Sequence, residues 1–163
     1  IEFVNGQKHG KSVWYYKSGK PYRVTQYRNG RRNGWQKKYY MNGDLKSKVM
    51  YENDIPQPGL KEYNMNKELM NDYPELVISK PEKGAQSNEF YIEIYMDNHW
   101  RKVEFYNENY HKLPSKKGKC RLESNVRKGH YEKKEINITA VLKTKMQNPY
   151  VVKKTKKLHI RNP

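Results

Sequence analysis

The residues best suited to chemistry in this sequence are aromatic rings interleaved with basic side chains, all within the first forty positions. The set comprises Trp14, Tyr15, Tyr16, Arg23, Arg31, Arg32, Trp35, Lys37, Lys38, Tyr39 and Tyr40. A ring flanked by cations can stack on a sugar or a base while the cations hold a carboxylate or a phosphate. In the alternative interpretation, the tyrosines pack in cross-strand pairs and the lysines protect sheet edges. The set is predicted to be a binding surface, with packing as the alternative.

No arrangement typical of catalysis accompanies these residues. The histidines have no ligand spacing to one another or to Cys120; they are His9, His99, His111, His130 and His159. Cys120 lies in a Lys-Cys-Arg-Leu segment, where a buried strand thiol is the expected state. No Gly-rich phosphate loop precedes a helix, and no pair of acids lies in apolar surroundings. The chain is therefore predicted not to be an enzyme and to need no catalytic residue, cofactor or metal.

The charge of the chain is strongly positive and unevenly distributed. There are 34 Lys and Arg against 17 Asp and Glu. No acid occurs from Phe3 to Gly43, which holds ten basic residues, and none occurs from Ile136 to Pro163. Such a field favours nucleic acid, acidic glycans, anionic lipid surfaces or an acidic protein. Alternatively, an AT-rich genome supplies much of the lysine, since the chain is rich in Lys, Asn, Tyr and Ile together.

A repeat of 24 residues organises the first part of the chain. Asn5-Gly6 recurs as Asn29-Gly30, and Tyr15-Tyr16 recurs as Tyr39-Tyr40. The same offset relates three further glycine and tyrosine pairs, which are Gly10 and Gly34, Gly19 and Gly43, and Tyr27 and Tyr51. Asn-Gly is a strong signal for a hairpin turn because both residues tolerate positive φ. Each unit is therefore predicted to be strand, tight turn, strand and looser turn. The predicted strands lie near residues 12–16, 21–27, 35–40 and 45–51.

These residues resemble the bacterial MORN-repeat variant family. Its units carry an Asn/Asp-Gly, a second Gly four residues later, an aromatic pair and a further Gly, as in Asn5-Gly6, Gly10, Tyr15-Tyr16 and Gly19. The resemblance covers residues 1–74 and implies a hairpin array with an interaction surface and no catalytic residues. Bacterial members are often antitoxin-like, or exported and lipid-anchored. In the third copy Lys67 replaces the repeat glycine and Asn64 the second tyrosine.

The predicted domains follow from where the repeat ends. Residues 1–55 form two MORN-like hairpin repeats, and residues 56–74 form a degenerate third repeat that serves as a connector. From residue 75 to 163 the repeat gives way to longer alternating strands, such as Phe90 to Met96 and Ile136 to Leu142. Period-2 alternation with spaced turns predicts a small antiparallel, immunoglobulin-like β-sandwich. The fold class is all-β.

Three functions are consistent with this sequence. The first is a non-enzymatic interaction or scaffold protein of the bacterial periplasm or cell envelope, which binds a protein or an acidic glycan through the repeat sheet. The second is an antitoxin-type protein partner in the cytoplasm. The third is a binder of nucleic acid or another polyanion, which is less favoured. No apolar run reaches the roughly 18 residues of a membrane span, and any export signal is expected to precede Ile1.

Overall fold

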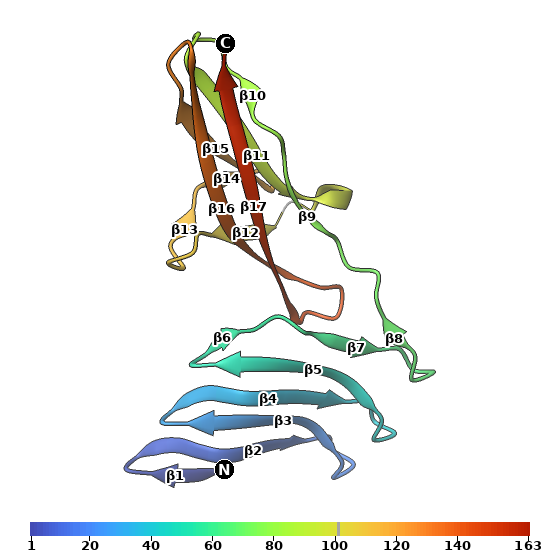
Figure 1. Ribbon diagram of the computed structural model, residues 1–163. Coiled ribbons are helices and arrows are strands. Elements are labelled where there is room, and N and C mark those ends of the chain that lie inside the picture. Colours follow the sequence, from blue (N-terminus) through green and yellow to red (C-terminus); the bar gives the residue numbers. More distant parts are fainter. Residues whose placement is uncertain (101) are drawn as a thin grey trace. The chain divides into compact units, whose positions relative to one another are not determined.

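The structure is a computed structural model that describes residues 1–100 and 102–163, without the side chain of His99. The chain is all-β with antiparallel sheets, as predicted (Figure 1). It divides into two compact units. The first unit comprises residues 1–72 and 144–151, and the second comprises residues 73–143 and 152–163. No helix in the described residues is long and apolar enough to span a bilayer.

The first unit is an eight-stranded sheet whose strands mostly follow one another in chain order, as Figure 1 shows. Its strands are β1 (Glu2–Val4), β2 (Gln7–Tyr15), β3 (Pro21–Arg28), β4 (Arg31–Tyr39), β5 (Leu45–Glu52), β6 (Ile55–Pro56), β7 (Lys61–Tyr63) and β8 (Leu69–Met70). The order in the sheet is β1-β2-β3-β4-β5-β7-β8, with β6 paired to β5. The four strands predicted in the two repeats correspond to β2, β3, β4 and β5. β2 and β4 begin earlier than predicted, because pairing continues up to the turns that precede them.

The 24-residue period of the sequence is also a period of the backbone. Three looser turns have positive φ at both central residues: 48° and 72° at Asn5-Gly6, 50° and 78° at Asn29-Gly30, and 48° and 71° at Asn53-Asp54. This combination defines a type I′ turn, whose twist matches that of the flanking strands. The repeat is therefore a structural unit of two strands and two turns.

The tight turns repeat with the same spacing, including the degenerate third copy. The amides of Tyr16, Tyr40 and Asn64 donate to the carbonyl four residues later, at 2.8, 2.8 and 3.0 Å. Gly19 and Gly43 adopt φ of 80° and 98°, and Lys67 adopts 64° in the equivalent place. Residues 56–74 thus include a short third hairpin, β7–β8, in which a lysine takes the left-handed conformation of the missing glycine.

One segment from far along the chain belongs to the first unit. Residues 144–151 contain the turn between β16 (His130–Lys143) and β17 (Pro149–Asn162). The turn is closed by hydrogen bonds from Thr144 N to Asn148 O and from Gln147 N to Thr144 O, both 2.9 Å. The Thr144 hydroxyl and the Asn148 side-chain amide donate to one carboxylate oxygen of Glu62, at 2.7 and 2.5 Å. All three side chains are buried. The last repeat is therefore completed by residues more than eighty positions away.

The second unit consists of two antiparallel sheets. One is ordered β10-β11-β15-β14 with β9 paired to β11, and the other is ordered β13-β12-β16-β17. The strands are β9 (Leu76–Ile78), β10 (Glu82–Lys83), β11 (Glu89–Met96), β12 (Val103–Tyr106), β13 (Lys112–Leu113), β14 (Ser115–Lys116), β15 (Lys119–Asn125), β16 (His130–Lys143) and β17 (Pro149–Asn162). A 3₁₀ turn, η1, covers Asp97–His99.

The core of the second unit is formed by the alternating apolar side chains of both sheets. In β11 the even-numbered positions 90–96 are all buried, whereas Tyr91, Glu93 and Tyr95 are partly exposed. In β16 the even-numbered positions 136–142 are also buried. The alternation expected from the sequence is confirmed in β11; in β16 it holds except at Thr139, which is also buried. Cys120 of β15 is 1% exposed, as expected for a strand thiol, and burial raises its pKa.

Some of the basic charge of the second unit has a structural use. Lys154 of β17 donates from Nζ to the carbonyl of Leu76 at 2.7 Å, and Lys156 donates to the carbonyl of Ile78. Both acceptors belong to the edge strand β9, whose outer carbonyls lack a further strand. These two lysines of the acid-free C-terminal segment therefore bridge the two sheets.

Candidate binding surface

The repeat sheet has two faces of different character, which the strand pairing defines. Directly opposed residues of an antiparallel pair have their side chains on the same face. One face, here the arginine face, carries Ser12, Trp14, Arg23, Thr25, Arg32, Gln36, Lys38, Ser47, Val49, Tyr51 and Glu62. The other, here the lysine face, carries Val13, Tyr15, Val24, Trp35, Lys37, Lys48, Met50 and Lys61.

Three lysines form a row across the lysine face, here called the lysine row. Lys37 of β4 is directly opposite Lys48 of β5, and Lys48 is directly opposite Lys61 of β7. Neighbouring strands lie about 4.8 Å apart, so the three positive charges follow one another at short intervals. Like charges directly opposite one another destabilise a sheet. Within the described residues no hydrogen bond or ion pair engages these three ammonium groups.

An indole ring accompanies the lysine row. Trp35 precedes Lys37 by two positions on the same strand and is opposite Met50. The ammonium of Lys48 lies 4.9 Å from the centre of the Trp35 ring, which is a cation–π distance. Trp35, Lys37 and Lys48 are partly exposed and Lys61 is exposed. The row is therefore accessible along its length.

The arginine face carries a row of mixed character across five strands. Trp14 pairs with Arg23, Arg23 with Lys38, Lys38 with Ser47, and Ser47 with Glu62. At the Glu62 end, the Lys38 ammonium donates to the Asn148 side-chain carbonyl at 2.7 Å. Burial, followed by the charge of Arg23, lowers the pKa of Lys38. This end of the row is closed by residues 144–151.

The other end of that row holds an arginine without an acceptor. The Arg23 guanidinium lies 4.8 Å from the centre of the Trp14 ring and 5.5 Å from that of Tyr22. Its Nε is buried, and no acceptor among the described residues receives its hydrogen. Trp14 is 52% exposed. Arg23 is thus enclosed by rings, next to another cation, and uncompensated by any acid in the row except the distant Glu62.

The second arginine of this face is fully engaged. Arg32 Nε donates to the Asp54 carboxylate at 2.8 Å, and its guanidinium lies 4.2 Å from the centre of the Tyr51 ring. This ion pair lowers the pKa of Asp54. Lys8 lies 5.5 Å from the centre of the Tyr27 ring in the preceding repeat, so a cation over the equivalent tyrosine recurs, although Tyr51 is buried and Tyr27 is only half-buried. Arg32 is therefore a structural residue rather than an open contact.

The two members of each tyrosine pair make different contacts. The hydroxyls of Tyr16 and Tyr40 donate to the carbonyls of Tyr39 and Tyr63 in the next repeat, at 2.7 and 2.8 Å. Tyr15 is 61% exposed and Tyr39 is partly exposed. One tyrosine of each pair therefore joins successive repeats through its hydroxyl.

The predicted binding set does not form one surface. Trp14, Arg23, Arg32 and Lys38 lie on the arginine face, whereas Tyr15, Trp35 and Lys37 lie on the lysine face. Arg31 is opposite Arg28 beside the β3–β4 turn. Lys48 and Lys61 lie outside the set predicted from the sequence. The pairing of Lys48 with Lys37 follows from counting outward from the turn at Asn42-Gly43, whereas the pairing of Lys61 with Lys48 depends on the β5–β7 alignment and has no such local signal. Asn148 also lies outside the predicted set, and no local signal indicates it.

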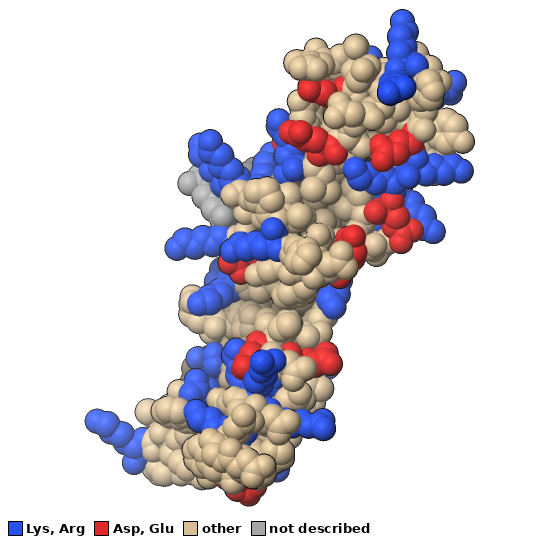
Figure 2. Space-filling view, turned by 90° about the vertical axis from the view of Figure 1, so that its left-hand side faces the viewer, with Lys and Arg blue, Asp and Glu red and all other residues tan. Residues whose placement is uncertain are grey.

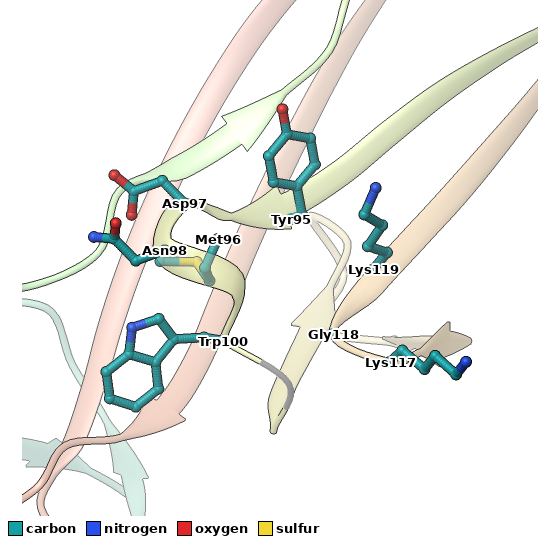
Figure 3. Close-up of a pocket in the computed structure, with 8 residues that line it drawn as sticks. All are labelled: Tyr95, Met96, Asp97, Asn98, Trp100, Lys117, Gly118 and Lys119. Atoms are coloured by element: carbon teal, nitrogen blue, oxygen red, sulfur yellow. The ribbon is translucent and has the colours of Figure 1, made fainter.

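A pocket of about 550 Å³ in the second unit is an alternative site (Figure 3). It is lined by Tyr95, Met96, Asp97, Asn98, Trp100, Lys117, Gly118 and Lys119. In Figure 3, Trp100 and Lys117 point away from each other, and Tyr95 points away from Trp100. The Lys119 ammonium is engaged by Glu93 at 3.1 Å, and Asp97 accepts from the Glu75 amide at 2.7 Å. The polar groups do not converge as they do in typical ligand sites.

Other kinds of site find no support among the described residues. No group of three or more His, Cys, Asp or Glu side chains there is placed to hold a metal ion, and the side chain of His99 lies outside them. Lys and Arg are spread over most of the surface visible in Figure 2 rather than gathered in one patch. A specific site therefore has to be recognised from the pairing of charges and not from net charge.

No protein-family model matches the chain, and no curated protein or solved structure is significantly similar to it.

Proposed function

We propose that the protein is a non-enzymatic interaction protein whose lysine row binds an acidic partner, either an acidic protein or an acidic glycan. The observation that carries the proposal is the direct cross-strand succession of Lys37, Lys48 and Lys61 without an acid. Three like charges in a row repel one another, and a bound anion relieves this repulsion. The hairpin array supplies a rigid support on which the charges are held in register.

The shape of the row favours an extended ligand. The three lysines lie on successive strands, so their line crosses the strands and follows the direction in which repeats succeed one another. A chain with closely spaced carboxylates can contact all three, and Trp35 offers an apolar ring beside them. The 24-residue structural period supports the resemblance to MORN-repeat variants, which implies an interaction surface.

A charge-matched comparison of variants tests the proposal on the full chain. Binding of poly-glutamate and of oligogalacturonate is measured by calorimetry for the parent, for K37Q/K48Q/K61Q and for K128Q/K133Q/K153Q. The control lysines are exposed and lie in the second unit. Exposed ion pairs contribute about 0.2–1 kcal/mol each, and removal of three at about 0.5 kcal/mol each is expected to weaken binding about tenfold.

The two triple variants lose the same net charge, so they separate a site from a general field. The proposal predicts a loss in the first variant and less than a threefold change in the control. Equal losses in both, or no binding of either acidic polymer, would show that the lysine row is not a site. The stronger of the two probes identifies the class of partner.

A further inference from the structure

We propose a second, separate binding site on the arginine face, formed by Trp14, Arg23 and Lys38, which takes a ring that carries a carboxylate. Trp14, Arg23 and Lys38 are directly opposed on three successive strands. The site lies on the opposite face of the sheet from the lysine row, so one bound chain cannot occupy both. It stands whether or not the lysine row binds a polymer.

Arg23 has a buried Nε that lacks a hydrogen-bond acceptor among the described residues. Buried polar groups in proteins are nearly always hydrogen-bonded, and an exception calls for an explanation such as an ion that binds there. Nε of Arg23 is such an exception among the described residues. Arg32 on the same face shows the usual state, since Asp54 accepts its hydrogens. Arg23 therefore lacks the anion that its counterpart possesses.

Two cationic residues, Arg23 and Lys38, are paired across neighbouring strands. Arg23 and Lys38 are directly opposite each other on β3 and β4. Lys38 reaches Asn148, whose side-chain carbonyl is neutral. The charge of Glu62, two strands from Lys38 and three from Arg23, raises the pKa of Lys38 by less than burial and Arg23 lower it. A carboxylate placed between the guanidinium and the ammonium would compensate both charges. The planar fork of arginine fits the two oxygens of a carboxylate.

The exposed indole of Trp14 favours a ligand that carries a ring besides its carboxylate. Trp14 lies over the guanidinium at 4.8 Å and still exposes 52% of its surface. A ring stacked over a guanidinium leaves the N–H donors, which lie in the guanidinium plane, free to bind at the edge of the guanidinium. A second ring packed on the free part of the indole can direct a carboxylate substituent to that edge. Acidic sugars and aromatic acids share this chemistry.

A nucleic acid strand is a poorer occupant of this site. Single-strand binding surfaces combine successive stacking rings with a groove of free cations. On this face the next tyrosines, Tyr27 and Tyr51, lie beneath Lys8 and Arg32, and Arg32 is paired with Asp54. Only one open ring beside one unpaired arginine is present among the described residues of the face. The site accordingly fits a single ring.

The test follows the indole N–H signal of Trp14 by two-dimensional NMR of the full chain, assigned with W14F. Four probes separate the two parts of the ligand: galacturonate and benzoate carry both ring and carboxylate, acetate only the carboxylate, and galactose only the ring. We expect galacturonate or benzoate to shift the signal with at least tenfold higher affinity than acetate and galactose. The stronger of the two identifies the source of the ring.

Substitutions complete the test. R23Q is expected to weaken the binding at least tenfold. R23K keeps the charge but not the planar fork of the guanidinium, and it is expected to weaken the binding about fivefold. R28Q removes the same charge elsewhere on β3 and is expected to weaken the binding less than twofold. Arg28 is exposed and lies opposite Arg31. An unmoved Trp14 signal with both ring acids, equal affinity for acetate, or unchanged binding in R23Q and R23K would each overturn the proposal. The lysine row is read separately, with poly-glutamate, which carries no ring, and with K37Q/K48Q/K61Q.

Discussion

Replacement of Asn148 by alanine is expected to destabilise the first unit strongly, although Asn148 is far from the repeats in sequence. Its carbonyl accepts from Lys38 at 2.7 Å, and its amide donates to Glu62 at 2.5 Å. The substitution therefore removes a hydrogen-bond partner from two charged groups, of which Glu62 is 1% exposed. Hydrogen bonds to charged groups contribute about 1.5–3 kcal/mol each. The expected loss in the free energy of unfolding is about 3–6 kcal/mol, a large part of the stability of a small domain.

The measurement must follow the first unit separately, because two units need not unfold together. Trp14 and Trp35 lie in the first unit and Trp100 in the second. In a W100F background, urea unfolding monitored by tryptophan fluorescence therefore reports on the repeat sheet. K145A, in an exposed position of the same turn, serves as control and should stay within about 0.5 kcal/mol of the parent. A loss below 1 kcal/mol for N148A would refute the structural role assigned to residues 144–151.

Three further predictions concern the repeats and the core. K67G should stabilise the first unit by about 1 kcal/mol, because Lys67 has a φ of 64° that glycine adopts without strain. G43A should destabilise the first unit by a similar amount, because Gly43 has a φ of 98°. Both changes are measured by urea unfolding, and opposite signs would contradict the turn assignment. Y40F should cost about 0.5–1.5 kcal/mol through loss of the bond to Tyr63, against no measurable change for the exposed Y15F. Because burial raises the pKa of Cys120, its contribution to stability is present below the ordinary thiol pKa of about 8.5 and is lost as the pH rises above it. The parent should therefore lose stability relative to C120A above about pH 8.5, and parallel curves would argue against a buried thiol.

The parts of the fold that depend on local signals were predictable from the sequence. Asn-Gly pairs and the glycines of the tight turns favour positive φ, so β2, β3, β4 and β5 and the turns that join them follow from these residues, whereas the short strands β1 and β6 are not among the predicted strands. Alternation in Phe90 to Met96 identified the buried face for the same reason, since period 2 is a local property. The immunoglobulin-like topology of the second unit stays a prediction.

What was not predictable depends on pairing and on distant contacts. Lys67 adopts a glycine conformation because the surrounding repeat holds it there, which overrides the local preference of lysine. The division of the candidate site between two faces depends on register, and the lysine row appears only when β4, β5 and β7 are aligned. Asn148 contacts Lys38 across 110 positions, so no local pattern of the sequence indicates it.

Lysine footprinting by mass spectrometry gives the most direct test of the acidic-partner assignment. The full chain is acylated briefly with and without saturating poly-glutamate or oligogalacturonate, and the modification of each lysine is compared. We expect strong protection of Lys37, Lys48 and Lys61 and little change at Lys128, Lys133 and Lys153. Uniform protection of all six, or protection confined to the second unit, would contradict it.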